Sequence, residues 1–246
     1  MTGEGDRPAL RIEIHGREVI DISFIQENRL YLLLGFAAVV TFLWLLRFRS
    51  RLRMKWYAAL CMGVLYVVYG VFCVKAFAVL EGIPISNGAM SMFGVVFFMP
   101  LGFWLGAKLT KQSIAEVSDI LTPCMIFSLL CARVNCLLAG CCMGRMIPGL
   151  EPWRFPTREL EMVFYIVFLA IIAPRILRGK TYGQVYPLFM FSYGVVRFVL
   201  EFFRVSSTDH LFHLSHVWAL IAFSLGLALY AEIKRRHARH GSRSRV

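Results

Sequence analysis

Charged residues are scarce in this sequence, at 17% of 246 residues, whereas 58% are hydrophobic and the mean hydropathy is +0.64. Soluble domains carry about 25% charged residues, so the composition excludes a soluble globular protein and predicts an integral membrane protein. Internal repeats and low-complexity linkers are absent, which favours one polytopic domain. Residues 1–22 are polar and lack the apolar stretch of a cleavable signal peptide, so none is expected.

Long apolar runs take up most of the chain. A helix needs about 20 apolar residues to cross roughly 30 Å of hydrocarbon. We therefore predict an all-α polytopic membrane protein with about seven transmembrane helices, near residues 29–46, 56–80, 90–109, 119–138, 160–177, 184–203 and 214–233. The predicted organisation is a polar extracytoplasmic segment (1–22), a seven-helix membrane domain (23–233) and a basic cytoplasmic tail (234–246).

Acidic residues are also few, 15 against 27 Lys and Arg, which leaves a net charge of +12. The basic residues crowd alternate loops, and basic loops mark the cytoplasmic side of a membrane protein. This pattern predicts an outside N-terminus, a cytoplasmic C-terminus and outward-facing loops at 81–89, 140–159 and 205–213. Nucleic-acid binding is not predicted, because the charge flanks the spans and suits anionic lipid better.

Histidine is scarce, with 6 residues, and none lies near the cysteines, which are Cys61, Cys73, Cys124, Cys131, Cys136, Cys141 and Cys142. Structural zinc sites usually pair thiolates two to four residues apart. Cys131, Cys136 and Cys141 are five apart, which turns a helix by roughly 140°. We therefore predict no metal site, and cysteines that act as small packing residues. Cys141 and Cys142 are the exception, because a reactive thiol is an alternative at the outer interface.

Three charged residues, Arg133, Arg197 and Glu201, interrupt the apolar runs. Charges within a span are costly and usually mark function. Helical spacing places Arg197, Glu201 and Arg204 on one face. An internal salt bridge with Arg204 at the interface is one explanation. A cationic cluster that binds an anion is the stronger one, because Arg133 adds a cation and guanidinium matches phosphate geometry. The predicted ligand is a phospholipid headgroup.

The second outward loop leads to Thr157, Arg158, Glu159 and Glu161 at the mouth of the fifth span. A cap by Thr157 on a helix that begins at Arg158 is one explanation, and Glu161 can still face the site. The histidines near the seventh span are expected to be solvated or interfacial: His210, His213 and His216.

Three segments resemble the prolipoprotein diacylglyceryl transferases of the bacterial inner membrane, and the resemblance runs from about residue 22 to 235. Residues 194–204 resemble the family's late Gly-x-x-Arg-Phe-x-x-Glu-x-x-Arg element. Residues 133–144 resemble its signature, which starts with Arg and ends with Gly eleven residues later. Residues 155–161 are similar to its His-Pro-Ser/Thr-Gln-x-Tyr-Glu segment.

The resemblance implies transfer of the diacylglyceryl group of phosphatidylglycerol to the lipobox cysteine of a prolipoprotein, with a thioether as product and glycerol phosphate as leaving group. It implies no metal or organic cofactor. The implied catalytic residues are Arg133, Arg197, Glu201 and Glu161. The implied headgroup-binding residues are Arg133, Arg197, Arg204, Asn135 and Arg158, and Cys141 and Cys142 stay as possible thiols.

The chain departs from the family pattern at several positions. Phe93 stands where the family has a histidine, Cys136 and Cys141 where it has Asn and Glu, and Phe155 and Arg158 where it has His and Gln. The base that deprotonates the acceptor is then Glu161, Glu201 or His210. Two rival functions stay open: a lipid-dependent transferase with another acceptor, in one version through an adduct on Cys141 or Cys142, and a non-enzymatic lipid-binding or transport protein.

Overall fold

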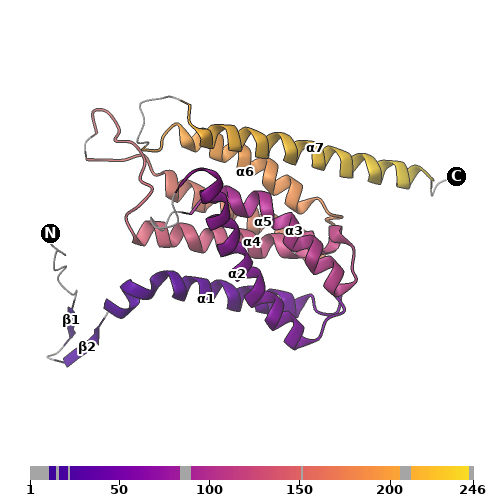
Figure 1. Cartoon of the computed structure of the whole chain (residues 1–246), viewed down its shortest axis with the longest axis horizontal. Coiled ribbons are helices and arrows are strands. Elements are labelled where there is room, and N and C mark those ends of the chain that lie inside the picture. The colour runs from indigo at the N-terminus through magenta and orange to yellow at the C-terminus, as the bar shows by residue number, and fades with distance from the viewer. Residues whose placement is uncertain are drawn as a thin grey trace.

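The computed structural model describes residues 11–14, 17–21, 23–83, 90–150, 152–205 and 212–243, which form seven helices and one short hairpin (Figure 1). The elements are β1 (Arg11–Ile14), β2 (Arg17–Asp21), α1 (Ser23–Arg47), α2 (Trp56–Leu80), α3 (Phe93–Thr110), α4 (Ile114–Leu138), α5 (Thr157–Leu177), α6 (Val185–Glu201) and α7 (Leu214–Arg243). The predicted all-α polytopic class is confirmed, since six of these helices are long and apolar enough to cross a membrane. The other is α6, which has 17 residues and carries Arg197 and Glu201.

Some boundaries differ from the prediction for local reasons. α4 begins at Ile114 and not near residue 119, because the Ser113 side chain caps it by accepting a hydrogen bond from the Glu116 N–H. α7 continues to Arg243, so the residues expected as a basic tail extend the last helix. The antiparallel hairpin of β1 and β2 lies in the segment expected to be only polar, and its polar composition gave no sign of strands.

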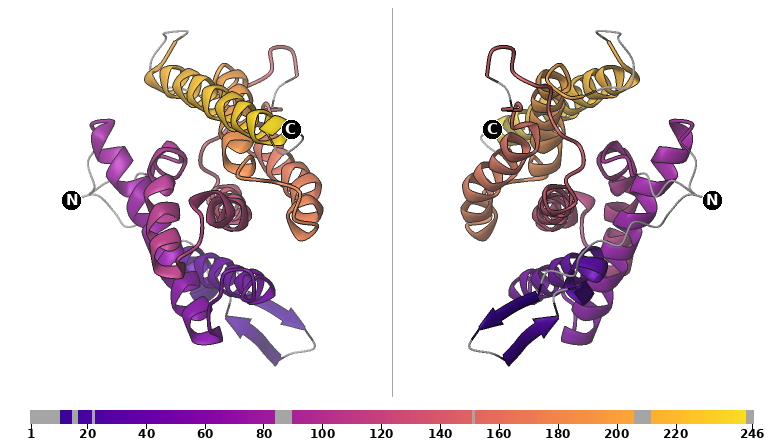
Figure 2. Two further views of the ribbon diagram at one scale, coloured as in Figure 1. Left: turned by 90° about the vertical axis from the view of Figure 1, so that its right-hand side faces the viewer. Right: turned by 90° about the vertical axis from the view of Figure 1, so that its left-hand side faces the viewer.

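α4 lies at the centre of the bundle, where it contacts α1, α3, α5 and α6. End-on views show α1 to α3 on one side of α4 and α5 to α7 on the other (Figure 2). α6 packs closely on α7, because Gly194 and Gly226 have no Cβ and let the two backbones approach. The central place of α4 puts its one arginine, Arg133, inside the protein.

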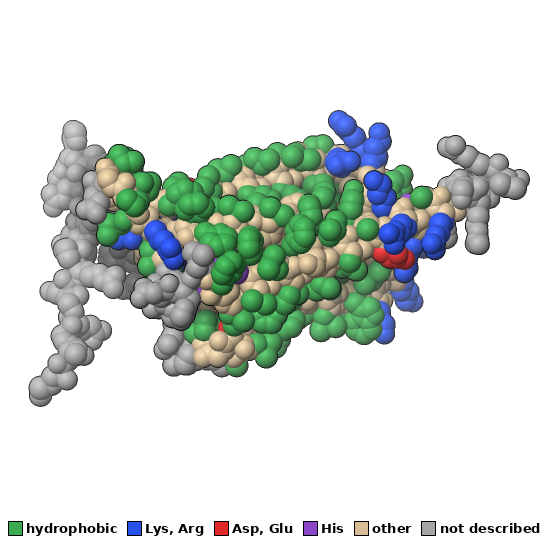
Figure 3. Space-filling view, turned by 90° about the horizontal axis from the view of Figure 1, so that it is seen from above, with side chains coloured by type: hydrophobic (Ala, Val, Ile, Leu, Met, Phe, Trp, Pro, Cys, Tyr) green, Lys and Arg blue, Asp and Glu red, His purple; other side chains and the backbone are tan. Residues whose placement is uncertain are grey.

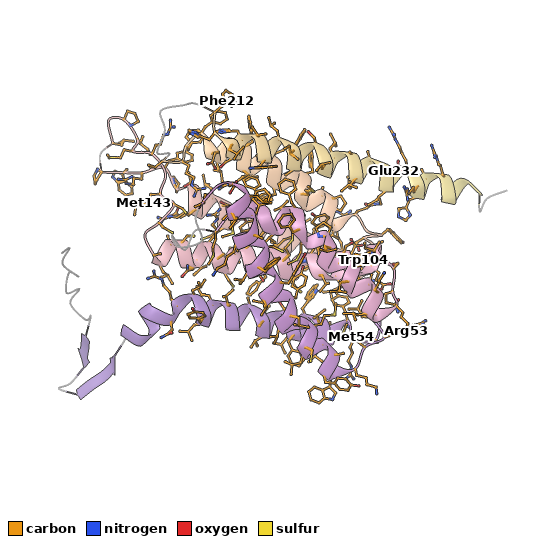
Figure 4. All side chains as sticks on the ribbon, viewed as in Figure 1. Arg53, Met54, Trp104, Met143, Phe212 and Glu232 are labelled. Carbon is orange, nitrogen blue, oxygen red and sulfur yellow. The ribbon has the colours of Figure 1, made fainter. Side chains whose placement is uncertain are left out.

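The two ends of the bundle differ in charge. Hydrophobic side chains cover its middle, and most visible Lys and Arg residues gather at the end where α7 finishes (Figure 3). Arg53 and Glu232 mark this end, whereas Met143 and Phe212 mark the opposite end (Figure 4). At that opposite end α4 and α6 finish and α5 and α7 begin.

Asp119 joins α4 to the start of α6. Its carboxylate is buried and accepts hydrogen bonds from the N–H groups of Gly183, at 2.6 Å, and Val185, at 3.0 Å. These N–H groups belong to the turn before α6 and to its first residue, where no helical partner is available. Asp119 therefore fixes the start of the helix that carries Arg197.

We predict that Asp119→Asn lowers the free energy of unfolding by about 1–3 kcal/mol, because the amide NH2 would face an N–H donor and leave it unsatisfied. The midpoint of thermal unfolding in detergent measures the change. Glu232→Gln is the matched control, since Glu232 is exposed and its substitution should leave the midpoint unchanged. An unchanged midpoint in Asp119→Asn would contradict this role.

Candidate functional site

Two buried arginines share one buried glutamate at the centre of the site. Arg133 Nη2 of α4 lies 3.0 Å from Glu161 Oε2 of α5, and Arg197 Nη1 of α6 lies 3.3 Å from the same oxygen. The three residues are 3%, 7% and 2% exposed for Arg133, Arg197 and Glu161. Three helices therefore meet at one carboxylate, which compensates two charges that would be very costly alone.

A second group of residues holds this centre in place. The Tyr165 hydroxyl donates a hydrogen bond of 2.6 Å to Glu161 Oε1, so both carboxylate oxygens have partners. Glu201 Oε2 lies 3.0 Å from Arg197 Nη2, one helical turn away, and 3.8 Å from Arg204 Nη1. The stripe predicted on α6 therefore forms, and Glu161 joins it from α5.

Several buried donors of the site have no protein partner among the described residues. They are Nε of Arg133, Nε of Arg197 and the hydroxyl of Tyr193. Buried polar groups are nearly always satisfied, so orphaned donors point to a ligand or ordered water. All three groups donate hydrogen bonds, and two carry positive charge. The buried acceptor Glu201 Oε2 also lacks a hydrogen bond, but it lies 3.0 Å from Arg197 Nη2, so the three donors favour an anion.

A small pocket opens beside these donors. Most residues that line it are charged, and they come from α4, α5, α6 and the two loops that follow α4 and α6. They are Arg133, Cys142, Thr157, Arg158, Glu161, Arg197, Leu200 and Arg204. The four arginines around it face three glutamates, Glu159, Glu161 and Glu201. The surplus is one positive charge, which supports the predicted preference for an anion.

The loop between α4 and α5 closes the pocket by pairing with the end of α6. Gly144 forms a β-bridge with Arg204, and the Arg145 N–H donates to the Phe203 carbonyl at 2.7 Å. Gly144 is required here, because a Cβ would overlap the Phe155 carbonyl. Steric crowding therefore explains why a glycine ends the 133–144 segment.

Thr157 is not the helix cap that one explanation assumed. α5 begins at Thr157 itself, and its hydroxyl donates to the Cys142 carbonyl at 3.5 Å. Arg158 Nη1 donates to the carbonyls of Cys136 and Cys141, at 3.4 and 3.1 Å. The start of α5 therefore holds the cysteine loop, because side-chain donors there bind the loop's carbonyl oxygens.

The prediction that Cys131, Cys136 and Cys141 diverge was wrong for Cys136 and Cys141, and Cys142 joins these two. It assumed one continuous helix, but α4 ends at Leu138 and the chain turns back, with φ of +65° at Gly140 and +56° at Cys142. The sulfur atoms of Cys136, Cys141 and Cys142 consequently lie within 4.8 Å of one another, close enough to be ligands of one ion. Cys131, by contrast, is buried in the apolar core.

Cys142 has a thiol whose pKa is lowered by its neighbours. Arg204 Nη2 donates to its sulfur at 3.2 Å. A hydrogen bond with Cys136 lowers the pKa of Cys142 well below its ordinary value, and the Arg204 charge lowers it further against the effect of burial. The predicted reactive thiol therefore lies inside the pocket.

Other predicted residues have different surroundings. Asn135 does not line the pocket. Phe93, at the position of the family's histidine, is buried with its ring centroid 5.7 Å from Arg197 Cζ, and its ring has no proton to exchange. His216 is buried and not solvated, because it packs among Phe198, Phe202 and Phe212. His210 lies outside the described residues.

Glu81 is a polar neighbour that sequence reasoning missed. It follows α2, and burial raises the pKa of its carboxyl, against a hydrogen bond from Ser91 and the charge of Arg197. The sequence indicated this residue only by its position, directly after a predicted span and shortly before the segment that contains Phe93. Its carboxyl therefore interacts electrostatically with Arg197.

Comparison with known proteins agrees with the geometry. The family model described as prolipoprotein diacylglyceryl transferase matches residues 19–232. Relatives named phosphatidylglycerol–prolipoprotein diacylglyceryl transferase come from Dehalococcoides mccartyi, Oleidesulfovibrio alaskensis and Polaromonas naphthalenivorans, at 22%, 30% and 27% identity. The alignments cover 64%, 61% and 51% of this chain and 67%, 60% and 51% of those relatives.

The chain thus spans about half to two thirds of the length of the relatives it matches. The match of the family model runs from before α1 into α7 and includes Arg133, Glu161 and Arg197, the residues that meet in the pocket. The chain belongs to the prolipoprotein diacylglyceryl transferase family.

Proposed function

We propose that this protein transfers the diacylglyceryl group of phosphatidylglycerol to the lipobox cysteine thiol of a prolipoprotein, at the outer face of the bacterial cytoplasmic membrane. The observation that carries the proposal is the pair of buried guanidinium groups on one carboxylate, each with an unpaired Nε–H beside the pocket. The names of the relatives supply the donor and the acceptor protein.

The arginines would act on the phosphate of the lipid. Thiol attack on the glyceryl carbon forms a C–S bond and breaks the C–O bond, so negative charge grows on the departing glycerol phosphate. Fixed guanidinium donors in a buried site stabilise such charge strongly, because they need no reorganisation. Arg133 and Arg197 are fixed by Glu161, and Glu201 orients Arg197.

Neither glutamate of the site is free to serve as the base. Glu161 has one oxygen between two guanidinium groups and the other bonded to Tyr165. Glu201 Oε2 is within ion-pair distance of Arg197, at 3.0 Å, and of Arg204, at 3.8 Å, although neither contact has hydrogen-bond geometry. Both therefore serve as anchors in the proposed mechanism, and thiol deprotonation falls to another group.

The acyl chains of the lipid would enter an apolar cavity that is lined by α1, α2, the start of α3 and α4. Leu129 and Ala132 of α4 line it, and Ala132 precedes Arg133. We assign this cavity to the acyl chains, because it is almost wholly apolar and adjoins the helix that carries Arg133.

The two ends of the bundle support the proposed outward orientation. The pocket lies where α4 ends and α5 begins, opposite the end at which Lys and Arg gather. Basic residues face the cytoplasm in membrane proteins. The pocket would then meet prolipoproteins on the outer face.

Arg133→Ala and Arg197→Ala should each reduce diacylglyceryl transfer at least about 100-fold, because each removes a donor to the leaving phosphate. Labelled phosphatidylglycerol and a lipobox peptide measure the rate, and the thioether-linked glyceride is the product. Arg197→Lys should also be strongly impaired, since an ammonium lacks the two-pronged geometry.

Arg236→Ala is the matched control for these variants, since Arg236 lies on the exposed part of α7, far along the helix from the pocket. It should transfer at the wild-type rate, and all variants should reach the membrane in equal amounts. Wild-type activity in both pocket variants would overturn the proposal.

Glu161→Gln should destabilise the fold by about 3–5 kcal/mol, because it leaves two buried guanidinium groups with one carboxylate. Thermal unfolding in detergent measures this loss. Glu159→Gln serves as the control, because Glu159 is only half-buried and its pair with Arg158 contributes at most about 1 kcal/mol. Equal unfolding midpoints for the two variants would show that Glu161 does not anchor the site.

A second candidate keeps the same lipid but changes the acceptor. The observation that favours it is the sulfur of Cys142 in the pocket, within hydrogen-bond reach of Arg204. Intact-mass measurement after incubation with phosphatidylglycerol alone separates the two. A diacylglyceryl mass on the protein that Cys142→Ser abolishes supports the second candidate, and an unmodified chain supports the first.

A further inference from the structure

The three thiols beside the pocket have the separations that a metal ion requires. A zinc–thiolate bond of about 2.3 Å with tetrahedral angles places ligand sulfurs about 3.8 Å apart. The sulfurs of Cys136, Cys141 and Cys142 all lie within 4.8 Å of one another. Small side-chain movements are therefore enough to close the three sulfurs around one ion.

The backbone around the cluster is held in an uncommon conformation. Cys142 has φ of +56°, which non-glycine residues rarely adopt. Thr157 and Arg158 of α5 bind the carbonyls of all three cysteines, and the Cys141 N–H donates to the Cys136 carbonyl at 3.2 Å. The loop is thus fixed from outside, as a ligand set must be if it is to receive a metal without refolding.

The charge around the cluster favours an anionic metal site. Three thiolates and one divalent ion sum to one negative charge, and the guanidinium groups of Arg158 and Arg204 both contact residues of the cluster. Arg204 already donates to the Cys142 sulfur. A disulfide would use only two of the three sulfurs and would leave that arginine beside a neutral group.

We propose that Cys136, Cys141 and Cys142 bind one Zn²⁺ ion, and that its fourth position binds the acceptor thiol and makes it a thiolate. This inference rests on the proposed transfer reaction. Zinc keeps a fourth position when three protein ligands hold it, and a thiol bound to it loses its proton. Copper(I) suits a thiolate site less here, because its single charge would leave two negative charges on the cluster.

The reaction balances without an oxidant or reductant. The acceptor thiol binds the ion and releases its proton to water. A sulfur lone pair then forms the C–S bond to the glyceryl carbon, and the C–O electrons leave with glycerol phosphate, which Arg133 and Arg197 receive. The ion would supply the deprotonation that Phe93 cannot provide and that the paired Glu161 and Glu201 are not free to provide.

Zinc binding by the purified full chain tests the site directly. With thiols reduced, competition against a chromophoric chelator should show one Zn²⁺ per wild-type chain. Cys136→Ser, Cys141→Ser and Cys142→Ser should each bind at least about 100-fold more weakly, since even a lost second-shell partner costs 10–100-fold. Co²⁺ substitution should give thiolate charge-transfer absorption in the wild type and lose it in these variants.

Cys61→Ser is the control, because Cys61 is an exposed thiol on α2 outside the cluster. It should bind zinc as the wild type does, and gel filtration should show the same folded species for all variants. A wild type that binds no zinc, or serine variants that bind it equally well, would overturn the site.

A transfer assay on the same preparations separates this inference from the proposed function. Chelated protein should transfer to the lipobox peptide at least about 100-fold more slowly than protein reloaded with Zn²⁺, and Mg²⁺ should not restore the rate. Full activity after zinc removal would overturn the zinc role and leave the proposed function standing. Zinc binding without transfer in either form would overturn thiol activation together with the proposed function.

Discussion

One carboxylate, that of Glu161, makes the rest of the site possible. Two guanidinium groups buried in a membrane protein are strongly destabilising unless a buried anion pairs with them. Glu161 does so for Arg133 and Arg197 at 3.0 and 3.3 Å, and Tyr165 fixes its other oxygen. The carboxylate joins α4, α5 and α6, so the bond that permits the charges also positions them. The Nε–H donors left over are what an incoming phosphate can use.

The packing of the bundle brings together the helices that carry Arg133, Glu161 and Arg197. α4 contacts four neighbouring helices, and this central position places Arg133 inside the protein. The carboxyl-terminal end of α4 lies at the same end of the bundle as the start of α5 and the end of α6. Asp119 fixes the start of α6, and Gly194 lets α6 approach α7 three residues before Arg197. The loop with Gly144 then pairs with the end of α6 and brings Cys142 to the pocket, with the sulfurs of Cys136 and Cys141 nearby. Phosphate binding and thiol chemistry thereby meet in one place.

Much of this was predictable from sequence, because apolar length and helical spacing are local properties. The helix positions, the α6 stripe and the partnership of Arg133 with it follow from composition and periodicity. The sharing of Glu161 by two arginines depends on how three helices pack, and no spacing rule contains that. The cysteine cluster was missed for a definite reason: a rule for continuous helices was applied across Gly140, where the helix has already ended. Glu81 was missed because burial in the folded state, and not its sequence neighbours, changes its proton affinity.

Arg133 and Arg197, which are held by Glu161, are proposed to bind the phosphate of a phospholipid. Native mass spectrometry of the purified protein with equal amounts of phosphatidylglycerol and diacylglycerol tests it most directly, because only one of these lipids carries a phosphate. The account predicts that the wild type retains phosphatidylglycerol and little diacylglycerol, and that Arg133→Ala loses this preference. Equal retention of both lipids by the wild type would contradict it.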